Sequence, residues 1–189
     1  MSNNVMTPEF RTSFSYVFRP SKPMEPGQEP KYSLTMLFKK GENLDVLKKA
    51  AQEVIVEKWG ADKAKWPKNM RTPFRDQGEK EHAGYEAGAV FITATSKQKP
   101  GLVDGRQNNA DIIDESQFYS GCYARATLKA FAYDRAGNRG VAFGLQNVQK
   151  IRDGEPLSGR LKAQDEFEPV SGGDEFDSTP PASLDAMFG

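Results

Sequence analysis

The segment Phe118–Val148, with the sequence FYSGCYARATLKAFAYDRAGNRGVAFGLQNV, decides the fold of this chain. After Cys122 the sequence alternates strictly, with an alanine or Leu128 at every second position and mostly larger side chains between them. Successive side chains of a β-strand point to opposite faces, so one face of the predicted strand is small and apolar. The other face carries Tyr123, Arg125, Thr127, Lys129, Phe131 and Tyr133.

A second strand is predicted over Val141–Val148, after the polar turn Asp134–Gly140. The two runs indicate a β-hairpin whose loop is longer than two residues. Three aromatic side chains between cations could form a second packed face, as aromatics in strands usually do. Because the alanine-rich face is the one suited to close packing, we expect the aromatic face to lie outside. Such a face is typical of sites that stack bases and neutralise phosphates of single-stranded nucleic acid.

The flanking sequence predicts three more strands and one helix. Strands are expected at Phe10–Phe18, Tyr32–Phe38 and Ala89–Ser96, and a helix at Leu44–Trp59, where apolar residues recur at helical spacing. The alternation in the second of these strands predicts that Tyr32, Leu34, Met36 and Phe38 share a buried face. About five short strands with hairpin turns favour a mainly β fold, an OB-fold-like five-stranded barrel with one main helix. An α+β sandwich is the alternative.

The distribution of charge along the chain is uneven, although 26 cations and 26 acids cancel in the 189 residues. No Lys or Arg follows Lys162, so the residues before position 164 hold 26 cations and 19 acids, a net of +7. The remaining seven acids give the C-terminal segment a net of −7. A basic body indicates an anionic partner.

Four further cations or aromatics are candidates for the same DNA-binding site. Lys97 and Lys99 flank a Pro-Gly turn, which could also be an ordinary solvated loop. Trp66 lies among lysines and could be a core anchor instead of a stacking residue. Arg139 follows the hairpin turn. The predicted DNA-binding set is therefore Tyr123, Arg125, Lys129, Phe131, Tyr133, Lys97, Lys99, Arg139 and Trp66.

The residues that usually carry catalysis or bind metals form no recognisable motif. His82 is the single histidine and has no second ligand at a usual spacing, and no Walker-type phosphate loop is present. The single cysteine, Cys122, lacks a nearby histidine and is expected to be a buried thiol. Asp76 and its acidic neighbours favour a solvated loop over a magnesium site. We therefore expect no catalytic residues, metal or cofactor.

Several motifs resemble those of phage single-stranded DNA-binding proteins of the DUF2815 (Enc34-type) family. They are Phe118–Tyr123, Gly137-Asn138 with Gly140, Gly144-Leu145 with Asn147–Gln149, Thr72–Asp76, Ser96-Lys97 with Lys99–Gly101, and Asp153–Leu157. The resemblance covers about residues 10–163. It implies an OB-fold that binds single-stranded DNA without marked sequence preference, in phage replication or recombination. It also implies that the acidic tail recruits replication partners.

Two regions are therefore expected, a DNA-binding domain at 1–163 and a disordered acidic tail at 164–189. The residues expected to bind a partner in the tail are Asp174, Glu175, Asp177, Asp185 and Phe188. The tail could also compete with DNA for a basic groove. The predicted partners are single-stranded DNA and replication or recombination proteins, not a membrane, and the predicted location is the host cytoplasm. Self-association is left open.

Two other functions remain as alternatives at this point. One is a magnesium-dependent nuclease or other DNA-processing enzyme that uses carboxylates such as Asp76. The other is a protein-interaction adaptor without a nucleic-acid role. The predicted mechanism is binding that coats and protects the strand, by aromatic stacking and phosphate neutralisation, and not catalysis.

Overall fold

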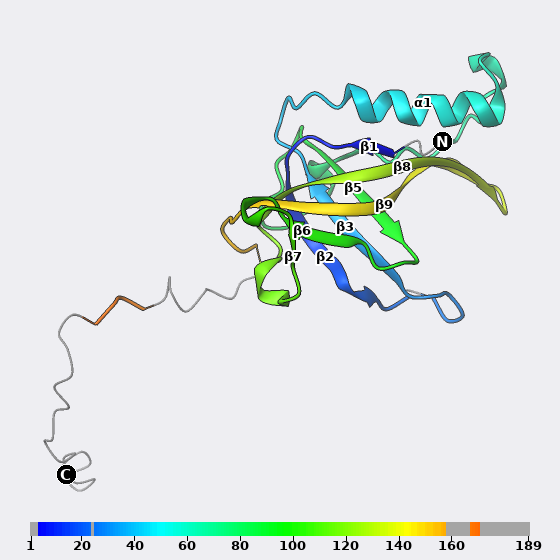
Figure 1. Cartoon of the computed structure of the whole chain (residues 1–189). Helices are drawn as coiled ribbons and strands as arrows, with labels where there is room; N and C mark the ends of the chain where they lie inside the picture. The colour runs from blue at the N-terminus through cyan, green and yellow to red at the C-terminus, as the bar shows by residue number, and fades with distance from the viewer. Residues whose placement is uncertain (1–3, 24, 158–166, 171–189) are drawn as a thin grey trace, which may run out of the picture.

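A computed structural model describes residues 4–23, 25–157 and 167–170. Within these ranges nine strands form a single sheet, accompanied by one α-helix and four short 3-10 helices (Figure 1). The predicted boundary at residue 163 lies outside the described residues. The same holds for the predicted disorder of the tail, apart from 167–170.

Five strands of the sheet close into a ring. Their order is β2 (Phe10–Ser21), β3 (Lys31–Leu37), β5 (Val90–Ser96), β9 (Asn138–Arg152) and β8 (Tyr123–Arg135), and β8 pairs again with β2. All these pairs are antiparallel except β5 with β9, which run parallel where Thr95 meets Gly144. The prediction of a mainly β, OB-like five-stranded fold with one helix is confirmed.

Four short strands extend the ring, and the sequence had not indicated them. β1 (Asn4–Met6) lies beside β8, β6 (Gly101–Asp104) runs parallel to β9, β7 (Ala110–Asp111) pairs with β6, and β4 (Arg75–Asp76) pairs with β5. The 3-10 helices are η1 (Lys63–Lys65), η2 (Gln77–Glu79), η3 (Gly105–Gln107) and η4 (Glu115–Gln117).

The α-helix α1 (Asp45–Trp59) lies between β3 and β5 in the chain and contacts β8, β1 and β9. Figure 1 shows it crossing above β1 and β8. Leu47 and Ala51 are buried, as the helical spacing predicts, and Ala50 is buried as well. The side chain of Asn43 accepts a hydrogen bond from the backbone N–H of Asp45 at 2.9 Å, which satisfies one free donor at the start of the helix.

The core lies inside the ring and under α1. The alanine-rich face of β8 is buried, and Leu128 has no exposed surface. Leu34, Met36 and Phe38 are buried as predicted, whereas Tyr32 is only half-buried near the start of β3. The strict alternation of β8 therefore separates a core-facing side from an outer side along most of its length.

The hairpin turn is shorter than the sequence suggested. Pairing of β8 with β9 continues to Arg135 and Asn138, which leaves Ala136 and Gly137 as a two-residue turn. Both turn residues have positive φ, 51° and 83°. This is the combination that matches the right-handed twist of a hairpin. The prediction of a longer loop is wrong because Asp134 and Arg139 face each other in the ladder and form an ion pair at 3.2 Å.

Candidate nucleic-acid interface

The outer face of β8 carries the predicted cations and aromatics at different levels of exposure. Arg125 and Lys129 are exposed, and the ring of Phe131 is 43% exposed. Tyr123 and Tyr133 are half-buried. The expectation that this side of the hairpin faces outward is confirmed for the central part of the strand.

Small residues of β9 lie directly opposite the large side chains of β8. Lys129 pairs with Gly144, Phe131 with Ala142, and Tyr133 with Gly140. Cross-strand partners are the closest neighbours on one face of a sheet. These β9 partners have at most a methyl group, so on the β9 side no large side chain lies beside Lys129 or Phe131. On its other side Lys129 pairs with Asn4 of β1.

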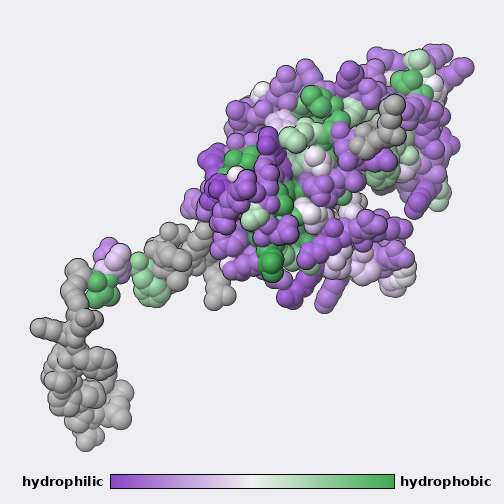
Figure 2. Space-filling view, in the orientation of Figure 1, coloured by the Kyte–Doolittle hydropathy of each residue, from purple (hydrophilic) through white to green (hydrophobic). Residues whose placement is uncertain are grey.

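A groove of about 480 Å³ continues this face toward the other end of β8. Its lining comes from β1, β8, β9, β6 and the loop after η3, and includes Met6, Val103, Arg125, Thr127 and Asn147. At Gly101, a Cβ would come within 2.4 Å of the Asn147 side-chain oxygen, so glycine makes room for that amide. Figure 2 shows apolar side chains reaching the surface between hydrophilic ones on the visible face of the body.

A row of polar side chains positions the guanidinium of Arg125 at this groove. Its Nε donates a hydrogen bond to Gln149 Oε1 at 2.5 Å, and Gln149 Nε2 donates to Asn109 Oδ1 at 2.7 Å. Gln149 lies directly opposite Arg125 in the ladder. The row uses one nitrogen of the guanidinium, which leaves its two terminal NH₂ groups for an acceptor outside the protein.

The charge of the outer face is not neutralised by nearby acids. Among the described residues, neither Arg125 nor Lys129 has a carboxylate within ion-pair distance. Arg139, by contrast, pairs with Asp134 at 3.2 Å at the hairpin tip. Two uncompensated cations beside an exposed aromatic ring suit an anionic, base-bearing ligand.

Tyr123 differs from the other predicted stacking residues because its ring is already in contact with cations. The guanidinium carbon of Arg152 lies 3.8 Å from the ring centroid, and that of Arg11 lies 5.8 Å from it. Arg11 also donates hydrogen bonds to the carbonyl oxygens of Gly121 and Glu155. The ring of Tyr123 is thus part of a packed arginine cluster and not an open platform.

Lys97 and Lys99 lie in the exposed turn between β5 and β6. Both of these strands pair with β9, at Gly144 and from Asn147 onward, so the turn flanks the edge of β9 opposite β8. Lys97 is 3.8 Å from Glu29, and Lys99 lies 6.0 Å from the centroid of the Phe18 ring. The structure thus brings the two lysines to the neighbourhood of the hairpin.

Trp66 does not join the hairpin face. It is half-buried in a pocket beside α1 that also contains Val141, a residue of the core-facing side of β9. Its Nε1 donates a hydrogen bond to the Gly60 carbonyl at 2.8 Å. This position separates Trp66 from Phe131, which faces the other side of the hairpin.

A second aromatic cluster, not predicted from the sequence, covers the outside of β2 and β5. The rings of Phe14 and His82 pack edge-on at 4.9 Å, as do those of His82 and Tyr85 at 5.3 Å. The ring of Tyr85 is tilted against that of Phe91 at 5.8 Å. Phe14 is 46% exposed and has a φ of 45°, at the register shift between β2 and β3. Burial raises the pKa of Tyr85, whose hydroxyl bonds to Ser13 at 3.0 Å. The members are too far apart in sequence to form a motif.

A buried lysine fixes the segment that follows β9. Lys150 is fully buried, and its Nζ donates to Asp153 Oδ1 at 2.7 Å and to the Gln117 carbonyl. Arg106 bridges Asp153 to Asp104 with nitrogen–oxygen distances of 3.1 Å. Hydrogen bonds from Lys150 and Arg106, respectively, hold the pKa values of Asp153 and Asp104 below their usual range. This network ties the end of β9 to Gln117 and to Asp104 of β6.

The remaining chemically reactive groups have structural partners. Burial raises the pKa of the Cys122 thiol, which lies 3.4 Å from the Thr12 hydroxyl. Asp76 accepts hydrogen bonds from the backbone N–H groups of Gly78 and Gly88, and these bonds lower its pKa. Among the described residues, no group of three or more His, Cys, Asp or Glu side chains is placed to hold a metal ion.

The described part of the chain contains no helix long and apolar enough to cross a membrane. The predicted partner-binding residues Asp174, Glu175, Asp177, Asp185 and Phe188 lie outside the described residues, so their role stays a prediction.

Comparison with solved structures places the fold among phage proteins. The single-stranded DNA-binding protein of bacteriophage Enc34, solved in complex with ssDNA, superposes with a TM-score of 0.66 at 21% identity, covering 82% of this chain and 89% of that one. The single-stranded DNA-binding protein gp2.5 encoded by bacteriophage T7 gives 0.58 at 13% identity, covering 85% and 98%.

Sequence comparison identifies the family. Protein p50 of Acyrthosiphon pisum secondary endosymbiont phage 1 is 31% identical over 174 residues, which cover 87% of this chain and 92% of that protein. The family model described as Enterobacter phage Enc34, ssDNA-binding protein, matches residues 3–178. This protein therefore belongs to the Enc34 family of phage ssDNA-binding proteins.

Proposed function

We propose that this protein binds single-stranded DNA on the outer face of the β8–β9 hairpin and thereby coats and protects the strand during phage replication or recombination. Family membership supports the ligand, and the arrangement of the hairpin supports the place. The site of action that goes with this function is the cytoplasm of the host cell.

The observation that carries the proposal is the pairing of Lys129 and Phe131 with Gly144 and Ala142. It leaves an exposed cation and a partly exposed aromatic ring without a large neighbour on the β9 side of this strand face. Lys129 and Arg125 would contact phosphates, and Phe131 would stack on a base. Every base has a π-face and every nucleotide has a phosphate, so such contacts bind with little sequence preference.

Other predicted residues would have secondary roles. Lys97 and Lys99 would extend the positive surface along the far edge of β9. Tyr133, half-buried opposite Gly140, would contact DNA with the edge of its ring near the tip of the hairpin. Arg139 and Tyr123 are occupied by Asp134 and Arg152, so we assign them a supporting role.

The test is fluorescence anisotropy with labelled single-stranded DNA, duplex DNA and single-stranded RNA, over a salt series and with either magnesium or chelator. The proposal expects the tightest binding to single-stranded DNA, weakened as salt rises because phosphate neutralisation releases counterions. Salt-independent binding, or equal preference for duplex DNA, would contradict it.

The same experiment addresses the two alternatives. Degradation of DNA in magnesium that stops with chelator would indicate a nuclease, and Asp76→Ala would then be the first variant to examine. A lack of any single-strand binding at low salt would indicate a protein-interaction adaptor. Within the proposal, the acidic tail either competes with DNA for the basic face or recruits replication partners.

A further inference from the structure

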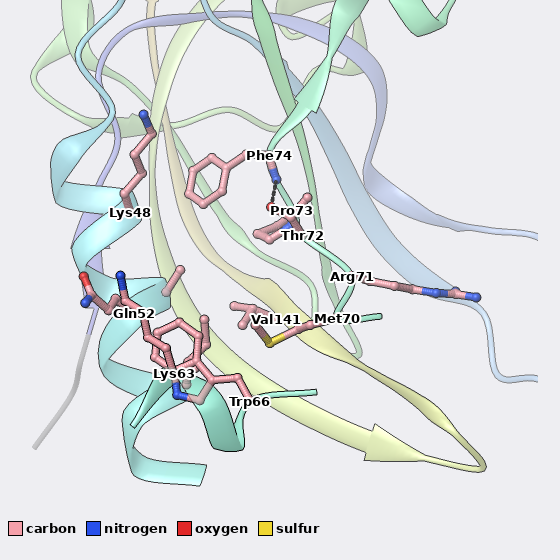
Figure 3. A pocket seen from close by; sticks show the side chains of 12 residues that line it. Lys48, Gln52, Lys63, Trp66, Met70, Arg71, Thr72, Pro73, Phe74 and Val141 are labelled. Carbon is pink, nitrogen blue, oxygen red and sulfur yellow. Dashed lines mark hydrogen bonds between the residues drawn. The ribbon is translucent and has the colours of Figure 1, made fainter. Parts of the chain in front are cut away.

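An apolar pocket of about 330 Å³ lies between α1 and the segment that leads from η1 to β4. Its floor is formed by Ile55 of α1 together with Trp66, Met70, Phe74 and Val141. Figure 3 shows the side chains of Trp66, Met70, Phe74 and Val141 around the space beside the helix. The volume is at the lower end of the about 300–1,000 Å³ that ligand pockets occupy.

Cations stand at the helix side of this pocket. Lys48 of α1 and Lys63 of η1 both line it, with Gln52 between them (Figure 3). Among the described residues, neither lysine has a carboxylate within ion-pair distance. The side chain of Arg71 points away from the pocket in the same view. The pocket therefore combines an apolar floor with an unpaired positive rim.

The pocket is separate from the proposed DNA face. Val141 belongs to the buried side of β9, whereas its neighbour Ala142 lies opposite Phe131 on the outer side. The indole N–H of Trp66 is already bonded to Gly60, so the ring offers mainly apolar surface. An occupant of this pocket needs apolar side chains and negative charge. It does not need the regularly spaced phosphates of a nucleic acid.

The chain itself contains a segment with this chemistry. Leu184, Met187 and Phe188 have the spacing i, i+3 and i+4, which in a helical turn would place three apolar side chains on one face. Ser183 precedes them as a suitable N-cap, and Asp185 adds negative charge to the preceding acids. The segment lies beyond residue 178, where the match to the family model ends.

The segment is long enough to reach the pocket from its own body. Leu157 is anchored by a hydrogen bond from its N–H to the Ser120 carbonyl, and 26 residues separate it from Leu184. Such a length spans up to about 90 Å when extended. That reach exceeds the roughly 15 Å radius of gyration expected for a body of this size, so every face is accessible.

We infer that the segment Leu184–Phe188 docks into the pocket between α1 and the η1–β4 segment of the same chain, with its apolar side chains on Trp66 and Phe74 and its acids beside Lys48 and Lys63. This inference does not rest on the proposed function, because Arg125, Lys129 and Phe131 are not among the residues that line the pocket. Docking would keep an acidic, apolar peptide on the protein surface until a partner with a similar pocket removes it.

The test is paramagnetic relaxation in the full-length ¹⁵N-labelled protein carrying Ala182→Cys with a nitroxide. Cys122 is fully buried and should not react, which the unsubstituted protein treated in parallel will check. The expected result is loss of the Trp66 indole signal and of the Met70 and Phe74 amide signals. Loss centred on Arg125 and Phe131 instead, or no localised loss, would overturn the inference.

Matched variants separate the pocket from general charge. The pair Lys48→Glu with Lys63→Glu should restore the Trp66 signal, whereas Lys49→Glu with Lys65→Glu, which changes exposed neighbours outside the pocket, should not. If both pairs of substitutions restored the Trp66 signal equally, the role assigned to Lys48 and Lys63 would be overturned. A further sample mixes nitroxide-bearing protein without ¹⁵N with ¹⁵N-labelled protein without nitroxide. In this mixture the signal loss should vanish, and its persistence would overturn docking within one chain. DNA affinity, measured separately, reports the proposed function.

Discussion

Lys129 of β8 lies directly opposite Gly144 of β9, so no side chain lies beside the lysine on this neighbour, and its partner on the other side is Asn4 of β1. We predict that Lys129→Ala weakens binding to single-stranded DNA and reduces the slope of log K against log salt by about 1, the loss of one phosphate contact. Lys49→Ala on α1 removes the same charge elsewhere and is the control. Equal effects of the two variants would show that only net charge matters.

Phe131 is expected to provide a base-stacking surface. Phe131→Ala should lose about 1–3 kcal/mol of binding free energy, or roughly 5- to 150-fold in affinity, with little change in salt dependence. Tyr123→Ala is the comparison, because Arg152 stacks on that ring at 3.8 Å and leaves less surface for a base. Anisotropy titrations measure both. A larger loss for Tyr123→Ala, in a variant that remains folded, would contradict this assignment.

The sequence motifs that contain Gly121 and Gly154 pack against each other backbone to backbone, with no side chain between them. A Cβ on Gly154 would lie 2.1 Å from the Gly121 carbonyl oxygen, and a Cβ on Gly121 would lie 2.1 Å from that of Glu155. Gly154→Ala should therefore lower the free energy of unfolding by about 1–3 kcal/mol or more. Gly144→Ala, where the nearest atom would be 3.6 Å away, is the control. Equal midpoints in denaturant would refute the close contact.

Acid should destabilise the network around Lys150. The pKa values of Asp104 and Asp153 are lowered in the folded state, so their stabilising effect is complete above the unfolded pKa near 4 and is lost as pH falls below it. Asp153→Asn should flatten this dependence. It should also cost about 1–3 kcal/mol, less than for a fully buried pair, because Asp153 is 53% exposed. Both effects are measured by unfolding midpoints from about pH 6 to about pH 2, which brackets the pKa values of carboxyl groups.

Removal of residues 164–189 should leave affinity for single-stranded DNA equal or higher. The segment carries seven acids and no cation, so it opposes the approach of a polyanion. The comparison is made at low and at high salt, where the difference should shrink. Weaker binding by the shortened chain would rule out competition between the tail and DNA.

The alternation of β8 allowed both of its faces to be predicted because burial follows the strand period of two. The small alanines suit close packing against the core, which favoured an outward position for Arg125 and Lys129. The pairing partners could not be predicted in the same way. That Gly144 and Ala142 lie opposite Lys129 and Phe131 follows only from the strand register, which depends on the two-residue turn at Ala136 and Gly137.

Other features depend on tertiary contacts that sequence patterns do not contain. Trp66 was assigned to DNA from its lysine neighbours, but its contacts with α1 and Val141 place it elsewhere. Lys150 is fully buried because Asp153 and the Gln117 carbonyl accept hydrogen bonds from its ammonium group, and the sequence gives no sign of these contacts. The cluster of Phe14, His82 and Tyr85 assembles residues from β2 and a distant loop.

The central claim concerns which face of the ring DNA contacts, and photocrosslinking tests it most directly. A single-stranded oligonucleotide with 5-iodouracil at successive positions is bound, irradiated and digested, and the crosslinked peptides are identified by mass spectrometry. We predict crosslinks to Phe131 and to its neighbours on the outer face of β8. Crosslinks confined to Phe14, Tyr16, His82 or Tyr85 would place the strand on the β2–β5 side and contradict this account.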